Sequence, residues 1–166
     1  MRSLLLATTA AIVAAAGCGP STPDPKSEVN DFHVELKDTS ADRCFETAGA
    51  KHTKKPDEPA KITVRHLLVK YAGAKKADAS VTRTRGQACL RAQEARNKLE
   101  QGADFAKVVK QYSEEPGAAT REGSLGAIER KDVVPPFADA AFELDVNQVS
   151  EVVETDFGFH VIMRSE

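Results

Sequence analysis

The chain has 166 residues, of which 23 are Lys or Arg and 25 are Asp or Glu, so its formal net charge at pH 7 is −2. This balance argues against a protein that binds nucleic acid through excess basic charge, and against a strongly acidic tail. The length allows one compact domain together with an additional segment.

Residues 1–17 have the features of a secretory signal peptide. Arg2 supplies a positive charge, and residues 4–16 are all apolar or small. Such a run is shorter than the roughly 20 residues that span a bilayer, but it is typical of a signal peptide. It ends in Ala15-Ala16-Gly17-Cys18, which resembles a bacterial lipobox, in which cleavage precedes the cysteine and the thiol is acylated.

The alternative is an ordinary signal peptide followed by an incidental cysteine. If the lipobox is real, Cys18 anchors the mature protein in a membrane of the cell envelope. Gly19 follows the cysteine, and in the lipoproteins that this region resembles, Gly rather than Asp there favours the outer membrane. We therefore expect a lipid-anchored protein that faces the periplasm.

Residues 18–60 are predicted to form a flexible tether. They contain five of the eight prolines, and small and charged residues dominate. As a flexible coil, this segment would reach about 35 Å. Cys44 lies in it and Cys89 lies further along the chain. In an oxidising compartment the two can form a disulfide, or they can remain unpaired, with Cys89 buried in a helix; both alternatives stay open at this point.

The compact domain is predicted to cover residues 61–166 and to begin with a buried strand at residues 62–70. This stretch is rich in β-branched and aliphatic residues, and its alternation places Ile62, Val64, His66 and Leu68 on one face. A histidine among apolar neighbours needs a polar partner. Residues 71–83 show no periodicity and are predicted to form a loop.

Three helices are predicted after this loop. Thr84 and Gln87 form a possible capping box for the first helix. Asp104 can cap the second, whose apolar residues recur at helical spacing, and Pro136 suits the first position of the third. Their apolar stripes indicate a core and carry no chemistry.

Strands are predicted at residues 123–129, 149–155 and 158–164, and the last one contains His160. The element order is therefore strand, helix, helix, strand, helix, strand, strand. Two consecutive helices and a terminal hairpin favour an α+β fold with a largely antiparallel sheet.

Five motifs of the compact domain resemble those of the parvulin family of peptidyl-prolyl isomerases. They are H-L-L-V-K at 66–70, Y-S-E-E-P at 112–116, G-S-L-G at 123–126, P-F-A-D-A-A-F at 136–142 and T-D-F-G-F-H-V-I at 155–162. The resemblance covers nearly all of residues 61–166. It implies a four-stranded antiparallel sheet surrounded by helices, and isomerisation of X-Pro bonds without a cofactor or metal.

The resemblance also implies roles for individual residues. The expected catalytic residues are His66, Glu115, Thr155 and His160. The expected apolar pocket for the substrate proline consists of Leu125, Val133 and Phe137. A phosphate-directed family member has a basic cluster at the positions of Lys70, Lys75 and Lys76. Glu115 replaces the Cys or Asp of better-known members. Each group has a simpler interpretation: satisfied core histidines, a solvated loop acid, ordinary core residues and a solvated basic loop. Two histidines without a third ligand are weak evidence for a metal site.

We therefore expect a lipid-anchored isomerase that assists the folding of exported proteins, with a preference for an acidic or phosphorylated residue before proline. Its expected partners are proline-containing polypeptide segments and, through Cys18, a membrane; we expect no nucleic-acid partner and a monomeric state. One alternative is a polypeptide-binding chaperone module with little isomerase activity. Another is a structural lipoprotein of the envelope.

Overall fold

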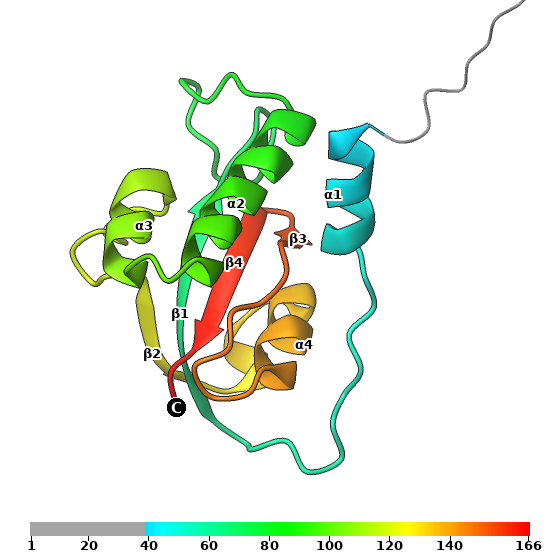
Figure 1. Ribbon diagram of the computed structural model, residues 1–166, viewed down its shortest axis with the longest axis vertical. Coiled ribbons are helices and arrows are strands. Elements are labelled where there is room, and N and C mark those ends of the chain that lie inside the picture. Colours follow the sequence, from blue (N-terminus) through cyan, green and yellow to red (C-terminus); the bar gives the residue numbers. More distant parts are fainter. Residues whose placement is uncertain (1–38) are drawn as a thin grey trace, which may run out of the picture. The chain divides into compact units, whose positions relative to one another are not determined.

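Four antiparallel strands form one sheet in the spatial order β2-β1-β4-β3 (Figure 1). The computed structural model describes residues 39–166. The strands are β1 (Ile62–Val69), β2 (Ser124–Ile128), β3 (Val153–Thr155) and β4 (Gly158–Arg164). The long strands β1 and β4 lie side by side at the centre of the sheet, and the short strand β3 forms one edge.

Four α-helices and one short 3₁₀ helix complete the fold. They are α1 (Ser40–Ala48), α2 (Arg85–Glu100), α3 (Phe105–Tyr112), η1 (Arg130–Asp132) and α4 (Pro135–Glu143). The predicted caps are confirmed: the side chain of Thr84 accepts from the Gln87 backbone in a capping box, and Asp104 caps α3. From β1 onward the element order is the predicted one, so the α+β fold class is confirmed.

The two faces of the sheet pack against different helices. Leu67 and Val69 of β1 belong to a buried cluster with α1, α2 and α3. Ile62 and Val64 belong to a second cluster, on the other face, with α4. The predicted alternation along β1 is therefore confirmed, and His66 lies on the face that α4 covers.

The strand predicted at residues 149–155 is shorter in the structure. β3 has only three residues, and Val149 forms an isolated bridge with Met163. Between them, the side chain of Ser150 accepts the Ile162 N–H at 2.9 Å. A side-chain oxygen thus takes the place of a backbone partner and interrupts the ladder.

The predicted flexible tether is wrong for Ser40–Ala48, which forms α1. Thr39 and Asp42 make a capping box at its start. A disulfide joins Cys44 of α1 to Cys89 of α2, with a Cα–Cα distance of 6.0 Å. The reason for the error is non-local: a nine-residue helix gains little from its own sequence, and α1 is held by α2. The predicted signal peptide, Cys18 and residues 18–38 of the tether lie outside the described residues.

Residues 49–61 connect α1 to β1 and pass along the α4 side of the domain (Figure 1). We call this stretch the connecting segment. Its side chains make four ion pairs with the rest of the described chain: His52–Glu143 at 2.7 Å, Lys55–Asp145 at 3.3 Å, Glu58–Arg130 at 2.5 Å and Lys61–Glu129 at 3.7 Å. This part of the predicted tether is therefore attached to the domain. None of the helices within residues 39–166 is long and apolar enough to cross a membrane.

Candidate functional site

Two buried histidines from neighbouring strands meet on the α4 face of the sheet. In the register of β1 and β4, His66 lies opposite Ile162 and His160 lies opposite Leu68, so the two histidines are diagonal neighbours. Their Nδ1 atoms are 3.2 Å apart. They are only 3% and 5% exposed, so each ring nitrogen needs a partner inside the protein.

Both remaining imidazole nitrogens are hydrogen-bonded. His160 Nε2 lies 2.8 Å from Thr155 Oγ1, and His66 Nε2 lies 2.8 Å from Glu115 Oε2. Thr155 Oγ1 also accepts the backbone N–H of Phe157 at 3.1 Å. The four predicted catalytic residues therefore form one continuous network, which we call the histidine network.

The hydrogen-bonding capacity of each group assigns a direction to this network. An ionised carboxylate only accepts, so His66 Nε2–H donates to Glu115. A neutral His66 then accepts at Nδ1 from the Nδ1–H of His160. His160 accepts at Nε2 from the Thr155 hydroxyl, whose oxygen is occupied by the Phe157 N–H. Every donor thus has one acceptor when both imidazoles are neutral.

The electrostatic environment keeps His160 neutral. Burial is the main cause that lowers the pKa of His160, and His66 lowers it further; Glu115 opposes them, and the pKa falls from 6.5 to about 3. Burial raises the pKa of Glu115, but the hydrogen bond and charge of His66 and the nearby Arg121 lower it more, so the net pKa is lowered. At neutral pH the network therefore contains a neutral His160 and ends in an anionic Glu115.

Arg121 holds the Glu115 carboxylate in place and was missed by the sequence analysis. Its guanidinium forms an ion pair with Glu115 Oε2 and donates to the backbone oxygen of Pro116 at 2.9 Å. Glu115 and Arg121 both lie in the loop between α3 and β2, whose sequence shows no hydrophobic periodicity. The only sequence feature that could have indicated this pair is the spacing of six residues between Glu115 and Arg121. The pair forms because the loop folds back on itself.

The same loop approaches β1 closely at Gly123. The His66 N–H donates to the Gly123 oxygen at 2.8 Å. Gly123 has a φ of +79°, and a Cβ at this position would lie 2.5 Å from the His66 oxygen. Only glycine fits here, so this residue brings the Glu115 loop within reach of His66.

Phe137, one of the three residues predicted to form the proline pocket, lies against both imidazoles. The ring of Phe137, from α4, meets both imidazoles edge-on, with centroid distances of 5.3 Å. Leu125 and Val133 are half-buried and pack against the same cluster. The structure therefore brings an apolar surface and the polar histidine network together in one site.

The basic loop contributes fewer free cations than its sequence suggests. Lys70 is buried, and its ammonium donates to the backbone oxygen of Lys76 at 2.8 Å. Arg83 and Arg85 form ion pairs with glutamates. Lys70 therefore holds the loop in place and, unlike its predicted role, does not present its charge to a substrate.

Lys75 and Lys76 remain exposed at the rim of the site. Their ammonium groups lie 5.2 Å and 5.8 Å from the ring centroid of Phe157. Phe157 follows Thr155 by two residues, so these cations are next to the histidine network. Within residues 39–166 no group of three or more His, Cys, Asp or Glu side chains could hold a metal ion.

Comparison with known proteins identifies similar sequences and structures. A family model described as the PPIC-type PPIASE domain matches residues 50–166. The foldase protein PrsA of Geobacillus sp. (strain WCH70) is 49% identical over 71 residues, which are 43% of this chain and 26% of that protein. The putative peptidyl-prolyl cis-trans isomerase dodo of Drosophila melanogaster is 39% identical over 113 residues, 65% of this chain and 68% of that one.

Solved structures of similar proteins agree with the observed fold. The peptidyl-prolyl isomerase ESS1 from Candida albicans has a TM-score of 0.59 at 26% identity and covers 69% of this chain and 66% of its own. The structure of PrsA from Bacillus subtilis has a TM-score of 0.51 at 29% identity, with 64% of this chain and 35% of that chain covered. This chain thus spans less than half the length of the PrsA proteins that it matches.

We expect the stability of the domain to fall as the pH drops below 6.5. The pKa of His160 is about 3 in the folded state and 6.5 in the ordinary state, so its stabilising contribution is complete above 6.5. Below that pH the unfolded chain binds a proton that the folded chain does not, which costs about 1.4 kcal/mol per pH unit down to the folded pKa.

The measurement is urea unfolding at several pH values between about 7 and 5, compared with a His160→Gln variant. The variant lacks this titration, so its stability should decline less steeply. Equal slopes for the two proteins would contradict a neutral buried His160.

Proposed function

This chain belongs to the PPIC-type, or parvulin, family of peptidyl-prolyl isomerases, and we propose that it catalyses cis/trans isomerisation of X-Pro bonds in exported polypeptides. The observation that carries the proposal is the histidine network beneath the apolar surface of Phe137. A proline ring can fill that surface while its peptide bond faces the polar floor.

Isomerisation needs no bond cleavage, so the site has to stabilise a twisted amide. The barrier of about 18–20 kcal/mol comes from amide resonance, and a 10⁵-fold acceleration requires only ~7 kcal/mol. Preorganised groups supply such stabilisation when they interact better with the twisted amide than with the planar one. A fully hydrogen-bonded pair of imidazoles is rigid and does not need to reorganise during the reaction.

The anionic Glu115 contributes to the same effect. Amide resonance places negative charge on the carbonyl oxygen, and twisting the bond removes this charge. A fixed carboxylate near that oxygen disfavours the planar form relative to the twisted one. Arg121 limits the rotation of Glu115, which keeps the anion in the site even though the side chain is 25% exposed.

The protein acts outside the cytoplasm in this proposal. The disulfide between Cys44 and Cys89 suits an oxidising compartment, and the relative from Geobacillus is a foldase. The lipobox-like sequence at residues 15–18 supports a lipid anchor on Cys18. The following residues then connect the isomerase domain to the membrane surface, and the outer membrane is the favoured location.

The exposed lysines at the rim provide a preference for anionic residues before proline. Lys75 and Lys76 are exposed and have no acidic partner among the ion pairs of the described residues. They lie on the aromatic ring that follows Thr155. A Glu, Asp or phosphorylated residue next to a bound proline would place its charge near them. Lysine lacks the bidentate geometry of arginine, so this selection is modest.

Replacing either histidine should reduce both activity and stability. We expect His66→Ala and His160→Ala to lower kcat/KM in a protease-coupled assay with an Ala-Pro tetrapeptide. Each should also lower the free energy of unfolding by about 1–3 kcal/mol, because the remaining imidazole loses a buried partner. Lys110→Ala, on the exposed side of α3, is the control. Full activity and an unchanged melting temperature in either histidine variant would refute the network. Binding of polypeptides without turnover by the unmodified protein would instead favour a chaperone module.

The anionic preference should appear at low salt. We expect kcat/KM for Glu-Pro and phosphoserine-Pro peptides to exceed that for Lys-Pro by about two- to fivefold. High salt should weaken the difference, since exposed charges are screened over ~8 Å at physiological ionic strength. Lys75→Ala/Lys76→Ala should abolish it, whereas Lys107→Ala/Lys110→Ala, which removes the same charge from α3, should not. Equal values for Glu-Pro and Lys-Pro at low salt would exclude this role.

Replacement of the lipobox cysteine should release the protein from the membrane. We expect Cys18→Ser to abolish acylation and to leave a folded, active domain in the soluble fraction. Palmitate labelling and membrane fractionation measure the two effects. A Cys18→Ser protein that is still acylated and membrane-bound would show that the anchor lies elsewhere.

A further inference from the structure

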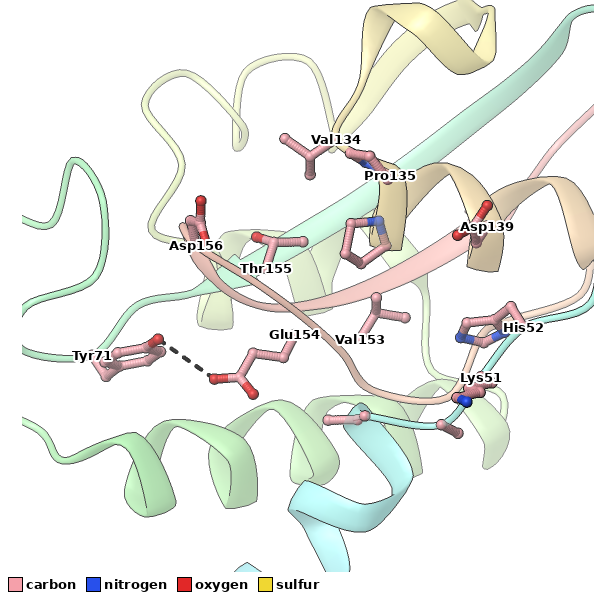
Figure 2. A pocket seen from close by; sticks show the side chains of 14 residues that line it. Lys51, His52, Tyr71, Val134, Pro135, Asp139, Val153, Glu154, Thr155 and Asp156 are labelled. Atoms are coloured by element: carbon pink, nitrogen blue, oxygen red, sulfur yellow. Dashed lines mark hydrogen bonds between the residues drawn. The ribbon is translucent and has the colours of Figure 1, made fainter.

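A groove of about 660 Å³ lies between β3 and the start of the connecting segment. Figure 2 shows its walls: Val134 and Pro135 at the start of α4, Lys51 and His52 after α1, and Val153 of β3 between them. This volume is within the range of about 300–1,000 Å³ that is typical of ligand sites. The proposed function assigns no role to most of these residues.

The edge of the sheet is open along this groove. β3 pairs only with β4, and its other side forms the edge. Thr155 and Gly158 close a two-residue turn, which makes them a hydrogen-bonded pair. By the alternation of an antiparallel ladder, the N–H and C=O of Glu154 then point away from β4. No backbone hydrogen bond outside the ladder involves Glu154 in residues 39–166.

The opposite wall also has free polar groups. The backbone N–H groups of Lys51 and His52 make no backbone hydrogen bond within the described residues. Lys51 is exposed and forms no ion pair in this part of the chain. The wall is nevertheless fixed in place, because His52 binds Glu143 at 2.7 Å and the disulfide holds the preceding helix α1.

The groove is continuous with the catalytic site. Thr155, whose hydroxyl binds His160 at 2.8 Å, also lines the groove. Val134, another lining residue, packs against the apolar cluster that contains Phe137. A polypeptide whose proline rests on Phe137 can therefore continue past Thr155 into the groove without leaving the surface.

We propose that this groove binds an extended flank of the substrate polypeptide, which adds to the edge of β3 as a further strand. The inference rests on the proposed function, because continuity with the isomerase site identifies the occupant. The backbone groups of Glu154 provide pairing without sequence specificity. The side chains of Val134 and Pro135 offer apolar contact, and Lys51 favours an acidic side chain in the flank.

The test compares two peptides with the same central Ala-Pro unit. One is a tetrapeptide that fills only the catalytic site, and the other carries an extended flank of roughly five residues, which spans ~17 Å at the strand rise. We expect the unmodified protein to show a kcat/KM about fivefold higher for the long peptide, mainly through a lower KM. N-methylation of alternate flank amides should remove this gain, since it removes backbone donors.

Two variants and a control test the location. Ala50→Trp fills the groove from an exposed position, and Lys51→Glu reverses its free charge. Ala50→Trp should bring the ratio of long to short kcat/KM close to one, and Lys51→Glu should lower this ratio when the flank carries an acidic side chain. Lys110→Glu, on α3, should keep the ratio of the unmodified protein. Because the two rates are compared within one protein, the ratio does not depend on the fraction that is folded.

Backbone amide shifts provide a second readout that does not require turnover. Titration with the long peptide should shift the amides of Glu154 and Lys51. If neither peptide is isomerised, the proposed function fails, yet these shifts still report occupancy of the groove. A ratio of one in the unmodified protein, or shifts confined to the catalytic site, would overturn the proposal. Shifts at Glu154 that grow with protein concentration in the absence of peptide would assign the edge to a second copy and would overturn it as well.

Discussion

The hydrogen bond between His66 and His160 is the constraint on which the site depends. Two imidazoles buried among apolar side chains are tolerated only if all four ring nitrogens have partners. Their partners come from one another, from Thr155 at the end of β3 and from Glu115 after α3. The network therefore requires the register of three strands and the path of one loop. A slip of one residue in β1 would turn His66 to the opposite face and leave the other groups unpaired.

The elements that local sequence determines were predictable, and those that depend on distant contacts were not. The alternation of β1, the capping box at Thr84 and the cap at Asp104 act over a few residues, so periodicity and capping were sufficient. The motifs also identified the four residues of the histidine network. Helix α1 was missed because its stability comes from α2 and the disulfide, although Ala41, Cys44 and Ala48 have helical spacing. Arg121 was missed because only the folded loop brings it to Glu115.

Charge counted along the sequence overstated the charge available to a ligand. Residues 70–85 contain five Lys or Arg and one Asp, which suggests a strongly basic loop. In the structure, Lys70 binds a backbone oxygen, and Arg83 and Arg85 are paired with glutamates from elsewhere in the chain. These three cations fix the shape of the loop, and that shape places Lys75 and Lys76 on Phe157. Structural and binding roles are thus divided among neighbouring residues of the same type, which composition alone does not reveal.

Backbone groups at the edges of the sheet also need hydrogen-bond partners, and the two edge strands differ in this respect. β2 lies at one edge and β3 at the other, and unpaired edges invite association unless they are short, charged or covered. β3 is limited to three residues, and the connecting segment stands beside it without forming backbone bonds to it. This segment prevents wide access to the edge but leaves a groove. The disulfide in α1 and the pair between His52 and Glu143 keep it at that position. An edge that is shielded but not paired has room for one extended chain rather than a broad surface, which is the occupant proposed above, and the position of α1 sets the width of that opening.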